Sequence, residues 1–149
     1  MGMFRAIDTA GSGLTAERTR MDVISDNLAN ANTTRTEDGG PYMRKVVQFE
    51  PRESDESMFS GLKPSAPSGK KQLGEGVRVR QITEAEGEPR RAYEPEHPDA
   101  NDEGYVLKPN VDPAKEMVDM ITATRAYEAN VSSIDSAKNM FNEALQIAR

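Results

Sequence analysis

The chain has 149 residues, of which 36% are hydrophobic, 5% aromatic and 30% charged, so side chains for a large apolar core are scarce. The net charge of −6 argues against binding nucleic acid or an anionic membrane through a basic surface. Because cysteine is absent, there is no disulfide, thiolate metal site or cysteine nucleophile. We find no pattern of a cleavable signal peptide and no apolar run of bilayer-spanning length, and therefore expect no membrane insertion and, if the chain is exported, export without a cleaved leader.

Residues 1–35 are predicted to form a long helical segment. From about Met3 to Ala31, apolar residues recur every seven residues at two heptad positions. The first position holds Ile7, Leu14, Met21 and Leu28, and the second holds Met3, Ala10, Ile24 and Ala31, with Glu17 as its one charged residue. Gly11 and Gly13 each cost about 1 kcal/mol relative to alanine in a helix. A kink at these glycines, or a later start near Leu14, is therefore an alternative to one continuous helix.

Asparagines are concentrated where this helix is predicted to end. Asn27 and Asn30 flank the heptad residue Leu28, although asparagine favours caps and turns over helix interiors. We expect both side chains to hydrogen-bond to a neighbouring helix or its terminal backbone, with Asn130 as a possible counterpart. Asn32 is placed to end the helix.

Residues 36–110 are predicted to be a small, irregular, β-rich middle segment. All nine prolines and eight of the eleven glycines lie between residues 39 and 113, which leaves both ends free of helix breakers over long spans. A turn at 38–41 precedes a strand that ends near Phe49, and a second strand begins at Val77 and loses its alternation at Ile82, which indicates a bulge or bend. Further strand material is expected at Tyr93 and from Gly104. Residues 52–75 are polar and are predicted to be a mobile loop.

Residues 111–149 are predicted to form the longer helical segment. Asp112 is a candidate N-cap followed by Pro113 at the first helical position, and no later proline or glycine interrupts the chain. A helix of roughly 36 residues is about 54 Å long, whereas a globule of this chain length is about 40 Å across. The apolar stripe therefore needs another helix beside it, either the N-terminal helix or a neighbouring subunit. The predicted fold class is mainly α, with long N- and C-terminal helices forming a coiled coil around a small β-rich middle segment.

Candidate catalytic and metal-binding residues are few. His97 is the only histidine, and it lies near Glu94 and Glu96 in a polar, proline-rich stretch that is typical of an exposed turn rather than a general base. Residues 99–104 match part of a calcium-binding loop, but Asn110 stands where the bidentate glutamate is required. We therefore predict no catalytic, cofactor-binding or metal-binding residue, and no enzyme.

Three sequence stretches resemble a known family. The stretch "GSGLTAERTRMDVISDNLANANTT" resembles the N-terminal signature of bacterial flagellar rod and hook proteins, in which Asn27, Ala29, Asn30 and Thr33 match the recurrent Asn, Ala, Asn, Thr pattern. The segment "GGPYMRK" and the stretch "GYVLKPNVDPAKEMVDMITATRAYEANVSSIDSAKNM" are similar to rod proteins of the proximal-rod type in particular.

The resemblance implies a structural subunit of the flagellar basal-body rod, which spans the periplasm and transmits motor torque. It implies export through the flagellar type III export apparatus without a cleavable signal peptide, and coiled-coil packing of the terminal helices within a helical assembly. The implied partners are copies of the chain itself, other rod proteins and the export-gate adaptor at the rod base. The alternative that remains is a soluble helical-hairpin adaptor or type III secretion chaperone, which would be a defined dimer.

The assembly interface is predicted to consist of heptad residues and asparagines of both helices. These are Ile7, Leu14, Met21, Ile24, Asn27, Leu28, Asn30, Thr33, Met117, Met120, Tyr127, Asn130, Val131, Ile134, Phe141 and Leu145.

Overall fold

The computed structural model describes residues 2–37, 39–52 and 75–147. In chain order the elements are α1 (Gly2–Ala29), β1 (Lys45–Pro51), β2 (Val77–Glu84), β3 (Arg90–Tyr93), β4 (Tyr105–Lys108) and α2 (Pro113–Ile147). The predicted combination of two long terminal helices and a small β-containing middle is confirmed. The predicted mobile loop 52–75 lies, apart from its two end residues, outside the described residues.

Helix α1 runs without a break through Gly11 and Gly13, so neither the kink nor the late start occurs. It ends at Ala29, two residues before the predicted end at Ala31. Asn30 closes the last turn, because both its backbone N and its side-chain Nδ2 donate to the carbonyl of Asp26, at 3.0 and 2.9 Å. Asparagine suits this place, since its side-chain amide can donate a further hydrogen bond to a backbone carbonyl at a helix end.

Helix α2 begins as predicted. The Asp112 carboxylate accepts a hydrogen bond from the backbone N of Ala114 at 3.0 Å, and Pro113 occupies the first helical position, where no backbone donor is needed. At 1.5 Å per residue, the 35 residues of α2 span about 52 Å and the 28 residues of α1 about 42 Å. The C-terminal end of α2 therefore extends past the start of α1.

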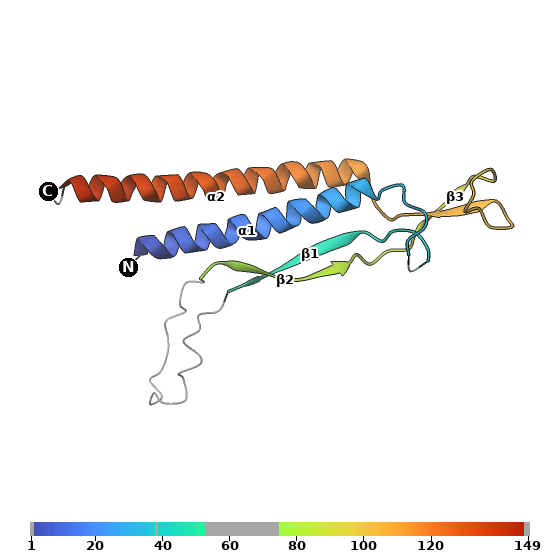
Figure 1. The fold of residues 1–149 in the computed structure, drawn as a ribbon, viewed down its shortest axis with the longest axis horizontal. Helices are drawn as coiled ribbons and strands as arrows, with labels where there is room; N and C mark the ends of the chain where they lie inside the picture. Colours follow the sequence, from blue (N-terminus) through green and yellow to red (C-terminus); the bar gives the residue numbers. More distant parts are fainter. Residues whose placement is uncertain (1, 38, 53–74, 148–149) are drawn as a thin grey trace, which may run out of the picture.

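The two helices pack side by side and antiparallel, with both chain termini at the same end of the molecule (Figure 1). Contacts occur in order along their whole shared length. Asn27 meets Glu116 at one end, Met21 meets Thr124, Gly13 meets Asn130, and Phe4 meets Phe141 at the other end. The N-terminal helix is thus the intramolecular partner of the long apolar stripe on α2.

An antiparallel sheet of β1 and β2 lies along α1 on the side away from α2 (Figure 1). Gln48 faces Gln81 and Phe49 faces Val79, so Arg80 is an extra residue in β2. The bulge predicted from the lost alternation is therefore present, close to Ile82. The Ser12 hydroxyl on α1 accepts a hydrogen bond from the backbone N of Val77 at 3.0 Å, which ties β2 to the helix.

A second antiparallel sheet, β3 with β4, lies beyond the helix ends (Figure 1). It uses the predicted strand material at Tyr93 and Tyr105, whose rings form an edge-to-face pair with centroids 5.3 Å apart. Val106 of β4 is fully buried. This sheet and the turn after α1 are joined through Asp99, which accepts a hydrogen bond from Thr34 Oγ1 at 2.7 Å.

The described core is thin and made largely of small side chains. Its buried apolar residues are Ala10, Ala16, Val23, Ile24, Tyr42, Val106, Val111, Ala123 and Ala137. Because α1 lies between α2 and the β1–β2 sheet, it buries residues toward both. Alanines at the helix contact allow the backbones of α1 and α2 to approach each other closely.

Candidate assembly interface

On α2, the most buried residues lie on a heptad line of small or polar side chains. On α2, Glu116, Ala123 and Ala137 are buried at seven-residue or fourteen-residue spacing, with Asn130 at the intervening position. On α1, the second heptad set holds the buried residues Ala10 and Ile24. The larger side chains lie beside these lines and keep more solvent exposure, which leaves apolar surface that α1 and α2 do not use on each other.

A buried polar cluster joins the end of α1 to the start of α2 and of β1. Asn27 is 1% exposed. Its Nδ2 donates to the Lys45 carbonyl at 2.8 Å and to Glu116 Oε2 at 3.1 Å, and its Oδ1 accepts from Lys45 N at 2.8 Å and from Tyr42 Oη at 2.9 Å. One carboxamide thus connects two helices and a strand.

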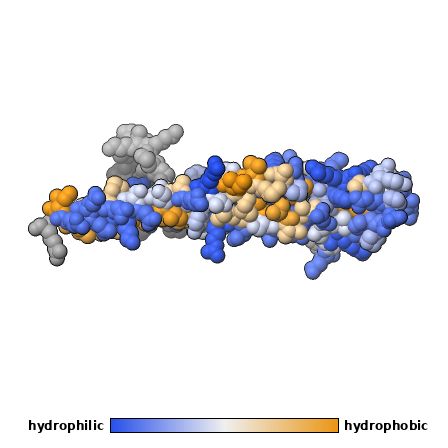
Figure 2. Space-filling view, turned by 90° about the horizontal axis from the view of Figure 1, so that it is seen from above, coloured by the Kyte–Doolittle hydropathy of each residue, from blue (hydrophilic) through white to orange (hydrophobic). Residues whose placement is uncertain are grey.

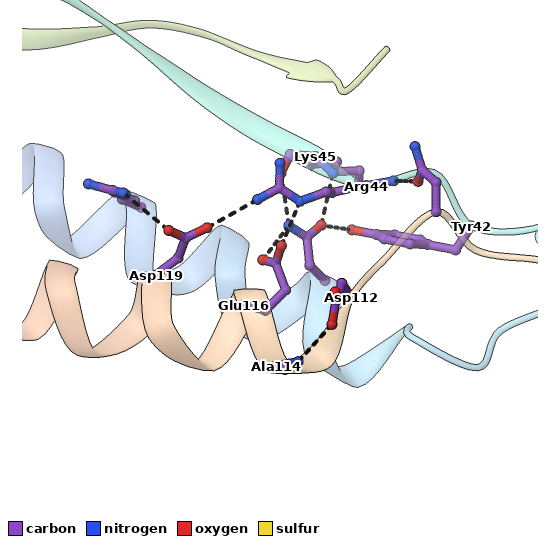
Figure 3. A network of polar contacts seen from close by, with 10 residues as sticks. Tyr42, Arg44, Lys45, Asp112, Ala114, Glu116 and Asp119 are labelled. Atoms are coloured by element: carbon purple, nitrogen blue, oxygen red, sulfur yellow. Dashed lines mark hydrogen bonds and ion pairs between the residues drawn. The ribbon is translucent and has the colours of Figure 1, made fainter. Parts of the chain in front are cut away.

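Glu116 supplies the negative charge of this cluster (Figure 3). It is fully buried on the first turn of α2, and its Oε1 accepts a hydrogen bond from Arg44 Nε, while the Arg44 Nη2 lies 3.3 Å from Asp119 Oδ2. The Arg44 backbone N donates to Asn110 Oδ1 at 2.8 Å. A buried carboxylate paired with a guanidinium and an amide donor is satisfied, whereas loss of Arg44 leaves an uncompensated charge and loss of Asn27 leaves an unmade hydrogen bond.

Tyr42 closes the cluster on the strand side, and its hydroxyl donates to Asn27. Burial raises the pKa of the Tyr42 hydroxyl, and the nearby carboxylates of Asp26, Glu116 and Glu84 raise it further. Both effects disfavour the phenolate. The neutral phenol is therefore held as a hydrogen-bond donor well into the alkaline range.

On the described α1 side, the predicted interface residues divide into two groups. Ile24 and Asn27 are buried within the chain, at 5% and 1% exposed. The others retain accessible surface, and Leu28 is the most exposed of them at 39%. The remaining ones are half-buried: Ile7, Leu14, Met21, Asn30 and Thr33.

Asn30 and Asn130 do not behave as partners of one another or of Asn27. Asn30 bonds to its own helix end, and its Oδ1 accepts from Thr33 Oγ1 at 3.1 Å. Asn130 lies over Gly13, where a Cβ atom would come within 2.8 Å of Asn130 Nδ2. The counterpart of Asn27 on α2 is Glu116, and not Asn130 as expected.

On α2, the predicted interface residues are more exposed. Met117 is 52% exposed and Leu145 54%, while Val131 and Phe141 are exposed to lesser degrees. Half-buried positions are Met120, Tyr127, Asn130 and Ile134. Two apolar residues that the heptad reading omitted, Val118 and Ile121, add to the exposed surface at 62% and 54%.

Hydrophobic residues gather at two places on the α2 side of the molecule. Figure 2, which views the molecule from this side, shows one group over the first turns of α2 and another at its C-terminal end. The first group, which we call the outer patch, consists of Met117, Val118 and Ile121. An exposed apolar surface on a helix is a feature of protein–protein contact sites.

The other chemistry-bearing residues form ordinary turns. His97 Nδ1 accepts a hydrogen bond from Asp99 N at 3.1 Å, and the hydrogen bond from Lys108 lowers the pKa of the exposed Glu94 carboxyl. Within residues 2–37, 39–52 and 75–147, no three His, Asp or Glu side chains converge as metal ligands would. Neither long helix of the described chain has a stretch both long and apolar enough to span a bilayer.

Sequence reasoning missed most of the buried polar cluster. Tyr42, Arg44 and Glu116 carry no local signal for burial, because charged and phenolic residues are usually exposed or half-exposed. One signal was available for Glu116, which stands one heptad before Ala123 and two before Asn130. Its place on the same heptad line as Ala123 indicates that it faces α1.

Comparison with known proteins matches both ends of the chain to rod proteins of the flagellum. Residues 7–35 match the family described as "Flagella basal body rod protein", and residues 102–147 match the family "Flagellar basal body rod FlgEFG protein C-terminal". The two matched segments contain most of α1 and all of α2 through Ile147. The paired helices thus define a flagellar basal-body rod protein.

Full-length relatives specify the type. The chain is 46% identical over 153 residues to the "Flagellar basal-body rod protein FlgC" of Bacillus subtilis, with all of both chains covered. It is 46% identical to the protein of that name in Borreliella burgdorferi, covering 99% of this chain and 98% of the relative, and 36% identical to that of Escherichia coli O6:H1 over the whole of both. The chain belongs to the FlgC family of flagellar basal-body rod proteins.

Proposed function

We propose that this chain is a structural subunit of the proximal part of the flagellar basal-body rod and that it polymerises through its two terminal helices. Its family membership supports the role of a rod subunit. The observation that supports polymerisation is the apolar surface that stays exposed on α2 although α1 packs against this helix. This surface consists of the outer patch and the exposed C-terminal turns. Helical stripes of this length are covered when neighbouring subunits place helices alongside, as in a coiled coil.

Helix contacts between subunits can transmit torque if they resist sliding of one subunit along the next. A heterologous contact between identical or similar subunits that does not close into a ring builds a helical filament. Long helix pairs then share strain over many side chains, and polar residues within the contact penalise shifted registers. We propose copies of this chain, other rod proteins and the export-gate adaptor at the rod base as the neighbours, and the flagellar type III export apparatus as the route to the rod.

The outer patch offers a direct test. Replacing Ile121 by glutamate should leave the thermal unfolding of the purified chain nearly unchanged, because surface substitutions usually alter stability by less than about 0.5 kcal/mol. The same substitution should reduce the amount of the chain in purified basal bodies and the swimming of the cells. A glutamate at Ser132, which is exposed on the same helix, is the matched control and should assemble normally.

The alternative of an adaptor or secretion chaperone makes a different prediction. Such a protein forms a defined dimer in solution and does not copurify with basal bodies. Finding the wild-type chain in a discrete dimer, with none in purified basal bodies, would overturn the proposed function. Cryo-electron microscopy of intact basal bodies should instead place the chain in the proximal rod.

A further inference from the structure

Glu17 is a charged residue at an otherwise apolar heptad position of α1. Its side chain is 15% exposed, and its Oε2 atom is buried without a hydrogen-bond partner in the described part of the chain. Arg20 Nη1 approaches this oxygen only to 3.8 Å, which is beyond hydrogen-bonding distance. A carboxylate oxygen removed from water without a donor is unfavourable, and such an atom in a native protein indicates a missing partner.

Glu17 lines a pocket between α1, α2 and the β1–β2 sheet. The pocket has a volume of about 430 Å³ and is open to solvent. Besides Glu17, its lining includes Asn130 from α2 and Phe49 and Val77 from the sheet. Gly13 forms part of the wall, and it has no side chain to fill the space beside Asn130.

We propose that this pocket, which we call the Glu17 pocket, binds the ammonium or guanidinium end of a lysine or arginine side chain from a neighbouring subunit. The inference rests on the proposed function, since it assumes that subunits pack against these helices. A cationic donor satisfies both the unmade hydrogen bond and the charge of Glu17. The Asn130 carboxamide provides a second acceptor, and the half-exposed Phe49 ring provides an apolar wall for the methylene stem.

The chemistry of the pocket favours a cation from a protein over a neutral group. Arg20 reaches this carboxylate only as a loose ion pair at 3.8 Å, and a second cation in the half-enclosed site would form an ion pair that is less screened than one on the surface. The net charge of −6 also attracts basic segments during encounter. The pocket would thus bind a basic residue at one fixed position along the helix pair and help to set the register between subunits.

The test compares Glu17→Gln with Asp22→Asn, an equal charge change at an exposed residue of the same helix. Each full-length variant replaces the wild-type chain in cells, and the amount in purified basal bodies is measured. Glu17→Gln should reduce incorporation about tenfold, the order expected for loss of one charge-assisted hydrogen bond, and Asp22→Asn should not. The thermal unfolding midpoint of purified Glu17→Gln should stay close to that of the wild type, because the loose ion pair with Arg20 at 3.8 Å contributes little to stability.

Charge reversal sharpens the comparison. Glu17→Lys should incorporate less than Glu17→Gln, because it places like charges together, while Asp22→Lys should remain near wild type. One outcome is that the wild-type chain is found in basal bodies and Glu17→Gln is incorporated normally. That result would overturn the proposed binding of a cation in the Glu17 pocket, and the proposed function would still stand. Absence of the wild-type chain from basal bodies would overturn the proposed function itself.

A cation from the same chain would also overturn the inference. Lys70→Gln with Lys71→Gln tests this possibility in the purified monomer. If the pair of substitutions lowers the unfolding midpoint, and the loss disappears when Glu17 is already glutamine, the partner of Glu17 is intramolecular. We expect no such coupling.

Discussion

Asn27 makes four hydrogen bonds from a position that is 1% exposed. Two of these bonds use its amide nitrogen as donor and two use its oxygen as acceptor, so neither aspartate nor leucine can replace it. Aspartate would also place a second carboxylate beside the buried Glu116. The asparagine in the family signature therefore has a role inside the subunit, as a link between α1, α2 and β1.

Replacing Asn27 by alanine should lower the free energy of unfolding by about 3 kcal/mol, because buried groups of Lys45, Tyr42 and Glu116 lose their partner at once. Urea unfolding followed by circular dichroism measures this difference. Asn32→Ala, at an exposed residue five positions on, is the control and should change stability by less than about 0.5 kcal/mol. Equal stability of the two variants would show that water replaces the lost bonds.

Tyr42 gives the cluster a signature at high pH. Its pKa is raised by burial and by neighbouring carboxylates, so folding favours the protonated phenol. The stability that this contributes is present below the ordinary tyrosine pKa near 10 and is lost as the pH rises through the higher pKa of the folded state. Absorbance of tyrosinate near 295 nm should show a late-titrating component in the wild type that is absent in Tyr42→Phe.

At the level of the helices, two glycines close in sequence should respond differently to the same substitution. A Cβ at Gly11 meets nothing within 4 Å, whereas one at Gly13 meets the Asn130 side chain at 2.8 Å. Gly11→Ala should therefore stabilise the chain by about 1 kcal/mol, the difference in helix propensity. Gly13→Ala should gain less or lose stability, because Asn130 has to move.

A double-mutant cycle checks the reason for this difference. Asn130→Ala removes the obstructing group, so Gly13→Ala should recover its propensity gain in that background. The same gain at Gly13 in both backgrounds would mean that α1 and α2 do not approach closely there. Chemical denaturation of the four proteins provides the measurement.

The extent of the elements followed well from the sequence, and their packing followed only in part. The Asp112 cap, the bulge near Ile82 and the continuity of the C-terminal helix are local features with local causes. The apolar heptads also predicted that α2 needs a helical partner. They could not show that the buried line would be the one with Ala123 and Ala137, because burial depends on which face meets α1 and on the sheet behind it.

The candidate site was harder to predict for a related reason. Heptad patterns identify side chains that are apolar, and they do not separate those used within the subunit from those left for neighbours. Ile24 is buried by the chain itself, while Met117 is 52% exposed. Arg44 and Glu116 form an ion pair although they are 72 positions apart in the sequence. A pattern within one segment cannot predict such a contact.

Across the whole molecule, the C-terminal turns of α2 should matter to assembly and little to the subunit itself. Residues 138–147 are all exposed, and near the start of this segment the Phe4 and Phe141 rings form an edge-to-face pair with centroids 6.3 Å apart. Ending the chain after Phe141 should keep the unfolding free energy within about 0.5 kcal/mol of the wild type while reducing incorporation into basal bodies.

A longer truncation provides the control for this experiment. Ending the chain after Val131 also removes Ile134 and the buried Ala137, and it should destabilise the purified subunit clearly, because α1 then loses part of its partner. Thermal unfolding separates the two cases. A large loss of stability in the shorter truncation would contradict the assignment of these turns to contacts between subunits.

The pairing of the first helix with the last also sets the order in which the subunit can fold. Asn27 and Glu116 are 89 residues apart, and the other contacts between α1 and α2 close still longer loops. Such distant contacts form late, because the entropy of closing the loop is lost before the contact is gained. During synthesis α1 is complete long before α2 exists, so a newly made chain holds an amphipathic N-terminal segment without its partner until α2 has been made.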